Sequence, residues 1–213
     1  MRCHQDPISS QRPLPDGRRG ASRGRWGRAI HRAAALAIAF AIGAAAAPGA
    51  EAPAKKPTRL LLDDFEGDVA RRWQNLKPSR AQVKRGKSSG LWTNMTDAVN
   101  LKLPHDWSRY EQWLLTVWCY SVKATNARFI VMLASDTAVT EGPDFYYSLV
   151  TVDWTGWKQL RIPLREFKGW DHPGGFGHIE AVAFNTSVDW VGTQREPGTV
   201  LYFDDLALEA PSE

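Results

Sequence analysis

The body of the chain, residues 58–210, is predicted to fold as one all-β domain, a jelly-roll β-sandwich. Three observations predict this fold class. Short apolar segments recur along the body, several of them alternate apolar with polar residues, and no segment keeps a helical period over three turns. Gly, Pro, Asp and Asn separate the segments, as expected of turns between antiparallel strands. About 160 residues are enough for a single domain with one sizeable core.

Ten segments rich in Val, Leu, Ile, Phe, Tyr and Trp predict about nine strands. They are Leu60–Leu62, Ala81–Lys84, Ser88–Thr93, Val99–Leu103, Gln112–Ser121, Ala127–Ser135, Phe145–Asp153, Lys158–Leu164, Ile179–Phe184 and Thr199–Leu208. Within the fifth segment, alternation predicts two sets of side chains on opposite sides of a sheet. The sets are Leu115, Val117 and Cys119 against Thr116, Trp118 and Tyr120. Short helical turns are expected only at residues 106–112 and 163–167.

The first 52 residues have the composition of an export signal. Residues 1–32 are Arg-rich without a hydrophobic period, residues 33–47 carry no charge, and Ala50-Glu51-Ala52 is a small-x-small cleavage pattern. We therefore predict a signal peptide over 1–52, a short tether over 53–57, and a secreted or periplasmic body. The alternative is an uncleaved membrane anchor, although a span needs roughly 20 apolar residues. Cleavage after the predicted signal peptide would remove the apolar stretch, so we expect no membrane span in the secreted body.

The distribution of charge argues against a nucleic-acid partner. The whole chain has a net charge of +4, but eight of its Arg residues and only three of its acids fall in residues 1–52. Residues 53–213 thus hold 19 of the 27 Lys and Arg and 20 of the 23 Asp and Glu, a net charge of −1. A near-neutral body lacks the broad basic surface that neutralises phosphates. Cys119, the single Cys of the body, is expected in the core.

The body carries no recognisable catalytic motif, and we predict that it is not an enzyme. It has no GxSxG sequence, no Gly-rich phosphate loop, and no zinc-protease spacing among His105, His172 and His178. A glycosidase needs two carboxyl groups across a sugar cleft, and none of the available acids has motif support. A small jelly-roll polysaccharide lyase or hydrolase is the less favoured alternative.

Six short motifs follow one another along residues 60–208. They are Leu62-Asp63-Asp64-Phe65-Glu66, Gly86-Lys87-Ser88-Ser89-Gly90-Leu91-Trp92, Asp106-Trp107-Ser108, Asp153-Trp154-Thr155-Gly156-Trp157-Lys158, Ile162-Pro163-Leu164 with Phe167, and Leu201-Tyr202-Phe203-Asp204-Asp205-Leu206. In this order they resemble the galactose-binding-like β-sandwich domains, above all the carbohydrate-binding modules of bacterial polysaccharide-degrading enzymes. The resemblance implies a secreted, non-catalytic domain that binds a poly- or oligosaccharide. The fold itself carries many functions.

The resemblance also implies a structural calcium ion that joins the first strand, the early hairpin and the last strand. The residues that match this site are Asp64 through its carbonyl, Glu66, the 85–88 turn including Lys87 through a carbonyl, and Asp204 or Asp205. Calcium takes six to eight such oxygen ligands. The alternative is that Asp63, Asp64, Asp204 and Asp205 are solvated acids at strand ends. The early hairpin offers Lys87 and no acid, a departure from the pattern.

Aromatic residues are the candidates for sugar contact, because a ring can stack on the apolar face of a pyranose. Nine Trp lie in the body, and most are expected to pack in the core or at its edges. Trp170 and Trp190 occupy loops longer than a hairpin needs, which favours a binding role. The second set of candidates comprises Tyr146, Trp118 and Arg128.

The same fold supports a second class of function. The alternative is a structural or protein-interaction β-sandwich of the cell envelope, with another envelope protein as its partner. It predicts no glycan affinity and a contiguous apolar patch on the surface.

Overall fold

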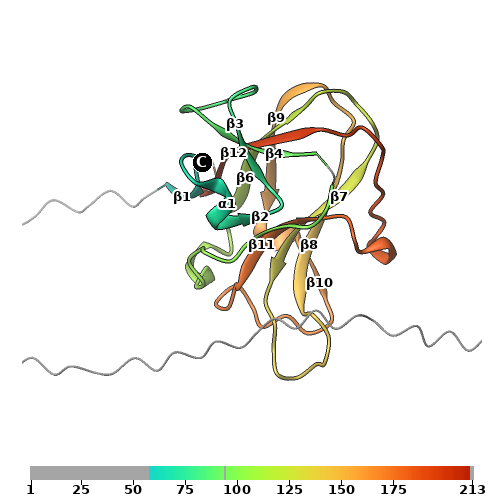
Figure 1. Ribbon diagram of the computed structural model, residues 1–213. Helices are drawn as coiled ribbons and strands as arrows, with labels where there is room; N and C mark the ends of the chain where they lie inside the picture. Colours follow the sequence, from blue (N-terminus) through green and yellow to red (C-terminus); the bar gives the residue numbers. More distant parts are fainter. Residues whose placement is uncertain (1–57, 94, 212–213) are drawn as a thin grey trace, which may run out of the picture. The chain divides into compact units, whose positions relative to one another are not determined.

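Two antiparallel sheets of six strands each make up the described part of the protein (Figure 1). The computed structural model describes residues 58–93 and 95–211, so the predicted signal peptide and tether lie outside the described residues. The all-β sandwich predicted from the sequence is confirmed. In this part of the chain, no helix has the length and apolar character needed to cross a bilayer.

The first sheet, sheet A, has the strand order β3-β4-β12-β6-β9, and β1 also pairs with β12. Its strands are β1 (Arg59–Asp63), β3 (Lys77–Ser79), β4 (Ser89–Trp92), β6 (Leu114–Ser121), β9 (Gly156–Pro163) and β12 (Leu201–Glu209). The central partners, β12, β6 and β9, come from distant parts of the chain. Long-range pairing of this kind is typical of a jelly roll.

The second sheet, sheet B, has the order β10-β8-β7-β11-β5-β2. Its strands are β2 (Trp73–Gln74), β5 (Ala98–Asn100), β7 (Arg128–Ala134), β8 (Phe145–Thr151), β10 (Lys168–Trp170) and β11 (Ala181–Asn185). The described helical segments are short: α1 (Val69–Arg72), η1 (Ser108–Tyr110), η2 (Leu164–Glu166) and η3 (Asp189–Val191). The turns η1 and η2 fall inside the ranges predicted from the sequence, but α1 and η3 lie outside them, so the expectation of only two helical turns is wrong.

One predicted strand is wrong. Residues Ala81–Lys84 form bends, and the strand that pairs with β4 is β3, at Lys77–Ser79. The reason lies in the backbone donors of the 80–88 loop. The N–H groups of Lys84 and Arg85 donate to Asp204 Oδ2, at 2.8 and 2.9 Å, so they are not free for a β-ladder.

Large aromatic side chains fill the space between the sheets. Phe184 of β11 stacks on Phe203 of β12 with centroids 3.8 Å apart, and on Trp73 of β2 at 5.3 Å. Trp92 of β4 is fully buried beside them. These contacts join the two sheets, and burying rings of this size contributes most of the apolar driving force.

The predicted alternation of β6 is confirmed. Leu115, Val117 and Cys119 are buried in the core, whereas Trp118 and Tyr120 are half-buried on the outer face of sheet A. Burial raises the pKa of the Cys119 thiol, because desolvation disfavours the thiolate. Cys119 is therefore an inert core residue.

A buried carboxylate, Asp63 at the end of β1, connects the two sheets. Its oxygens accept hydrogen bonds from the indole N–H of Trp73 at 2.9 Å and the amide of Asn100 at 3.1 Å, both in sheet B. Arg72 forms a two-pronged ion pair with it, at 2.9 and 3.0 Å, and the Phe65 N–H donates at 2.7 Å. Asp63 is thus not the solvated acid considered from the sequence. A buried charge is tolerated only when it is paired in this way.

Replacing Asp63 by Asn should lower the free energy of unfolding by about 2–4 kcal/mol, because Arg72 loses its charged partner and the indole a strong acceptor. Asp68→Asn is the matched control, since its pair with Arg71 is exposed on both sides and should cost less than about 1 kcal/mol. Urea unfolding measures both. Equal losses in the two variants would contradict the connecting role of Asp63.

Candidate functional site

Two exposed Trp side chains meet on the outer face of sheet B. Trp170 ends β10 and Trp190 lies in η3, and their ring centroids are 5.5 Å apart at an interplanar angle of 47°. Their exposed fractions are 38% and 60%. Trp170 also stacks on Phe145 of β8 with centroids 6.3 Å apart. The structure therefore brings together the two residues that the sequence placed first.

The connection from β11 to β12, residues 186–200, carries Trp190 to this place. It is the orange-red segment whose short helical turn stands beside the sandwich (Figure 1). Val188 is buried in a small cluster with Ile130 and Phe145, on the outer face of sheet B. Gly192 closes η3 in the left-handed region, with φ of 92°, and its N–H donates to Asp189 O. Apolar anchoring and a glycine cap thus fix the direction of the indole.

The strand register sets the shape of this face. Trp170, Phe145, Ala134 and Ala181 are paired across four neighbouring strands and form one row. The adjacent residues of β11 on the face are also small, and Ala181 and Ala183 pack with Val99, Met132 and Ala134. Large rings therefore stand at one side of the face, and small side chains form its floor.

The carboxylate of Asp144 holds the segment that follows Trp170. Its Oδ1 accepts hydrogen bonds from the N–H of His172 at 3.0 Å and the hydroxyl of Thr140 at 2.7 Å. Its Oδ2 accepts from the N–H and hydroxyl of Thr137, at 2.9 and 2.7 Å. These donors lower the pKa of Asp144 far below the usual range, although burial opposes them. Asp144 is thus a positioning residue for the Trp170 loop.

The second set of predicted residues is divided between different surfaces. Arg128 lies on the outer face of sheet B, where its guanidinium donates to Gln194 Oε1 at 3.0 Å. Tyr146 points to the opposite side of β8 and stacks on Phe176 at 4.7 Å. Trp118 lies on the outer face of sheet A, with Lys84 Nζ 4.0 Å above its ring. Tyr147, which the sequence did not single out, lies on the Trp170 side, 6.0 Å from Phe145.

The outer face of sheet A carries a second group of aromatic residues. Tyr120 packs edge-to-face against Trp157 and Tyr202, with interplanar angles of 66° and 80°. All three are half-buried. Rings packed in this way cover one another's faces, so they are less suited to stack on a sugar than the exposed pair on sheet B.

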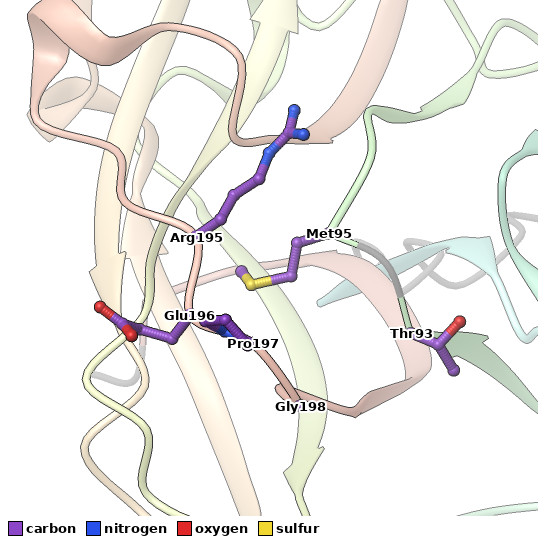
Figure 2. Close-up of a pocket in the computed structure, with 6 residues that line it drawn as sticks. All are labelled: Thr93, Met95, Arg195, Glu196, Pro197 and Gly198. Atoms are coloured by element: carbon purple, nitrogen blue, oxygen red, sulfur yellow. The ribbon is translucent and has the colours of Figure 1, made fainter.

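Two pockets have Arg195 as a common lining residue. One is lined by Thr186, Ser187, Asp189 and Arg195 and has a volume of about 470 Å³. The other, about 310 Å³, is drawn in Figure 2 and is lined by Thr93, Met95, Arg195, Glu196, Pro197 and Gly198. Figure 2 shows the guanidinium end of Arg195 directed away from Glu196 and Thr93. The guanidinium of Arg195 contacts Thr186 and Ser187, which line the first pocket.

Two of the predicted calcium ligands converge on the 84–88 turn. Glu66 Oε1 accepts from the N–H groups of Lys87 and Ser88, at 2.5 and 3.0 Å. Asp204 Oδ2 accepts from the other end of the turn, but its Oδ1 is buried and meets no donor among the described residues. Burial raises the pKa of Asp204, and the nearby charges of Asp205 and Glu66 raise it further.

The other predicted ligands are placed differently. Asp205 is buried and already paired with Arg59 at 2.6 Å and Arg85 at 3.3 Å. Asp64 is exposed, and its side chain accepts from the N–H of Glu66. Lys87 offers its N–H to Glu66, and its side chain is exposed. Asp205 is thus neutralised by two Arg side chains, whereas Asp204 has no ion pair among the described residues. Of the two, only Asp204 has a carboxylate oxygen without a partner.

Replacing Asp144 by Asn should destabilise the protein most at neutral pH. A lowered folded-state pKa means that the carboxylate stabilises the fold above its unfolded pKa, near pH 4, and that this stability is lost as the pH falls further. The difference in melting temperature between the protein and Asp144→Asn should therefore narrow from pH 7 to pH 2. A difference that widens on acidification would refute the role of this carboxylate.

Comparison with known proteins supports the same fold. No family model and no curated protein matches the sequence. The family 11 carbohydrate-binding module of the cellulosomal cellulase Lic26A-Cel5E of Clostridium thermocellum superposes with a TM-score of 0.52 at 20% identity, over 73% of this chain and 96% of that one. A family 11 module of the same organism in complex with a β-1,3-1,4-mixed-linked tetrasaccharide gives 0.52 at 21% identity, over 73% and 97%. A family 30 carbohydrate-binding module gives 0.50 at 16% identity, over 65% and 75%. The chain thus has a β-sandwich fold similar to that of these family 11 and family 30 modules.

Proposed function

We propose that the protein is a non-catalytic carbohydrate-binding domain that holds a poly- or oligosaccharide on the outer face of sheet B. The observation that carries the proposal is the exposed pair of Trp170 and Trp190. An indole that is 60% exposed leaves a large apolar face in water. A pyranose ring has an apolar face of matching size and a rim of hydroxyls, so stacking covers the indole without desolvating the hydroxyls.

Polar groups on the same face are available as partners for those hydroxyls. Asp189 is the neighbour of Trp190 in η3, and Arg128 lies further along the face, opposite Thr151 at the other end of β8 from Phe145. Aromatic surface with a few polar groups is the usual composition of a small-ligand site. The fold shared with a module that binds a β-1,3-1,4-linked tetrasaccharide makes mixed-linkage glucan the first probe to use. The signal-like leader supports a secreted or periplasmic location.

Protein binding is the second candidate. Leu149 is 42% exposed on the same face, and its Cδ2 lies beside Gly192, at the end of η3. Together with Trp170 and Trp190 it extends the apolar surface, which is the feature expected of an interface with another envelope protein. Affinity for a glycan supports the carbohydrate-binding function, and the protein-interaction function predicts no such affinity.

The hydrogen bonds of Asp136 and Asp144 support a non-catalytic role for these two acids. Asp144 accepts four hydrogen bonds, and Asp136 accepts one from the Asp144 N–H. Burial raises the pKa of Asp136. Both groups serve the 135–144 loop, whereas a glycosidase requires two carboxyl groups free to reach a glycosidic bond.

We also propose that calcium binds between Glu66 and Asp204. The buried Oδ1 of Asp204 supports this proposal, because it has no donor in the described chain and a cation would offset the repulsion between the two acids. The described residues hold no cluster of three acidic or His side chains, so backbone oxygens would have to supply most of the ligands. Carbonyls of the 84–88 turn and of Asp64 would complete the oxygen ligands. Calcium here would stabilise the fold by joining the first strand, the early hairpin and the last strand.

Replacing Trp170 or Trp190 by Ala should weaken glycan binding by roughly thirtyfold, about 2 kcal/mol, because each ring is a central aromatic contact. Affinity electrophoresis through mixed-linkage glucan, xylan and mannan measures the loss. Trp157→Ala, on the outer face of sheet A, should bind like the unmodified protein. If Trp157→Ala abolishes retardation and Trp190→Ala does not, the glycan binds to sheet A, and the proposal is refuted.

Adding calcium at 100 times its dissociation constant should raise the melting temperature by about 5–10 °C. Asp204→Asn should remove this increment, because it removes the charge facing the ion. Asp205→Asn should lower the melting temperature equally with calcium and with chelator, since its partners are Arg59 and Arg85. A melting temperature that is the same with calcium and with chelator would exclude the calcium site.

A further inference from the structure

The larger of the two pockets and the aromatic pair share the η3 turn. Asp189 lines this pocket, and Trp190 is the next residue of the same η3 turn. Its volume of about 470 Å³ lies within the range of small-ligand pockets. The other lining residues are Thr186, Ser187 and Arg195. Every lining residue is polar, in contrast to the apolar surface beside it.

The guanidinium of Arg195 is held in a fixed orientation by two hydroxyls. Its Nε donates to Thr186 Oγ1 at 2.7 Å, and one Nη2 hydrogen is directed to Ser187 Oγ at 2.8 Å. Each hydroxyl in turn donates elsewhere, Thr186 to the carbonyl of Met95 and Ser187 to Asp97 Oδ1. A hydroxyl has one hydrogen, so both can only accept from Arg195. The orientation of the guanidinium is therefore set before any ligand binds.

This arrangement leaves unused hydrogen-bonding capacity in the pocket. A guanidinium has five N–H donors, and Arg195 uses two of them within the described residues. Arg195 forms no ion pair with a described residue, and the Asp189 carboxylate makes no described hydrogen bond or ion pair. The pocket thus presents a donor group and an acceptor group that are not paired with each other. Adjacent hydroxyls of a sugar, which both donate and accept, match such a pair.

The charges of the pocket favour a neutral sugar. Asp189 balances Arg195 among the lining residues, and Asp97 lies one hydrogen bond further away, behind Ser187. A uronate or sulfate group would gain the interaction with Arg195 but would meet the like charge of Asp189. Neutral hydroxyls meet no such repulsion.

We infer that the pocket formed by Thr186, Ser187, Asp189 and Arg195 binds one neutral sugar unit of the glycan through adjacent hydroxyls and thereby sets which sugar is accepted. The inference rests on the proposed function, since the chain must continue from the unit stacked on Trp190. Stacking tolerates many sugars, because every pyranose has an apolar face. Hydrogen bonding to hydroxyls depends on their configuration, so the selectivity is assigned to Arg195 and Asp189.

The test compares Arg195→Met and Asp189→Asn with the unmodified protein and Trp190→Ala. Arg161→Met and Asp153→Asn are the controls, because they make the same changes at exposed positions outside the outer face of sheet B. Affinity electrophoresis uses mixed-linkage glucan, xylan, mannan and polygalacturonate, and melting temperatures confirm folding. Arg195→Met and Asp189→Asn should each weaken binding to the retained neutral glycan roughly tenfold or more, and the controls should not.

Each result separates the inference from the proposed function. Binding that Trp190→Ala abolishes and that both pocket variants leave unchanged would overturn the inference alone. Tighter retention by polygalacturonate than by every neutral glycan would overturn the assignment to neutral sugars. No retention in any gel, from a folded protein, would refute the proposed function and the inference together.

Discussion

The sandwich depends on how it accommodates one buried charge. Asp63 ends the first strand of sheet A, yet most of its partners, Trp73 and Asn100 among them, belong to sheet B or lead into it. Apolar packing between the sheets is not directional, whereas hydrogen bonds to a carboxylate have fixed distances and directions. A carboxylate that needs all its donors at once permits one placement of the sheets. The described residues contain no disulfide, so the hydrogen bonds and the ion pair of Asp63 fix the relative position of the sheets.

The position of the sheets then decides which residues reach the candidate site. The register of β10, β8 and β7 places Trp170 beside Phe145 and opposite the alanine floor. The same outer face offers Ile130 and Phe145 as an apolar seat for Val188, which brings Trp190 to Trp170. Asp144 holds the segment after Trp170 through the N–H of His172, and Arg195 holds the 186–195 segment through Thr186. The proposed binding residues thus lie at the end of β10 and in the 186–200 connection, and the strands of sheet B set the geometry of both.

The sequence predicted what local patterns determine and missed what depends on distant contacts. Alternation in β6 and the two short helical turns were predicted correctly, because periodicity and turn chemistry are local. Trp170 and Trp190 were singled out by loop length, and the structure places them together. Tyr146 and Tyr147 are neighbours in a strand packed on both faces, so the sequence could not tell which of them shares the face of Trp170. The Ala81–Lys84 segment forms bends where a strand was predicted, and the backbone N–H of Lys84 at its end donates to Asp204, 120 residues away. The buried state of Asp63 likewise requires Asn100, 37 residues away.

The central claim is that glycan binds to the outer face of sheet B and not to that of sheet A. The most direct measurement is a titration of the isotope-labelled protein with mixed-linkage glucan oligosaccharides, observed through the indole N–H resonances of its Trp residues. We expect the Trp170 and Trp190 resonances to shift, together with the backbone resonances of residues 186–195, and the resonances of Trp118 and Trp157 to stay in place. Shifts at Trp118 and Trp157, with Trp170 and Trp190 unchanged, would contradict it.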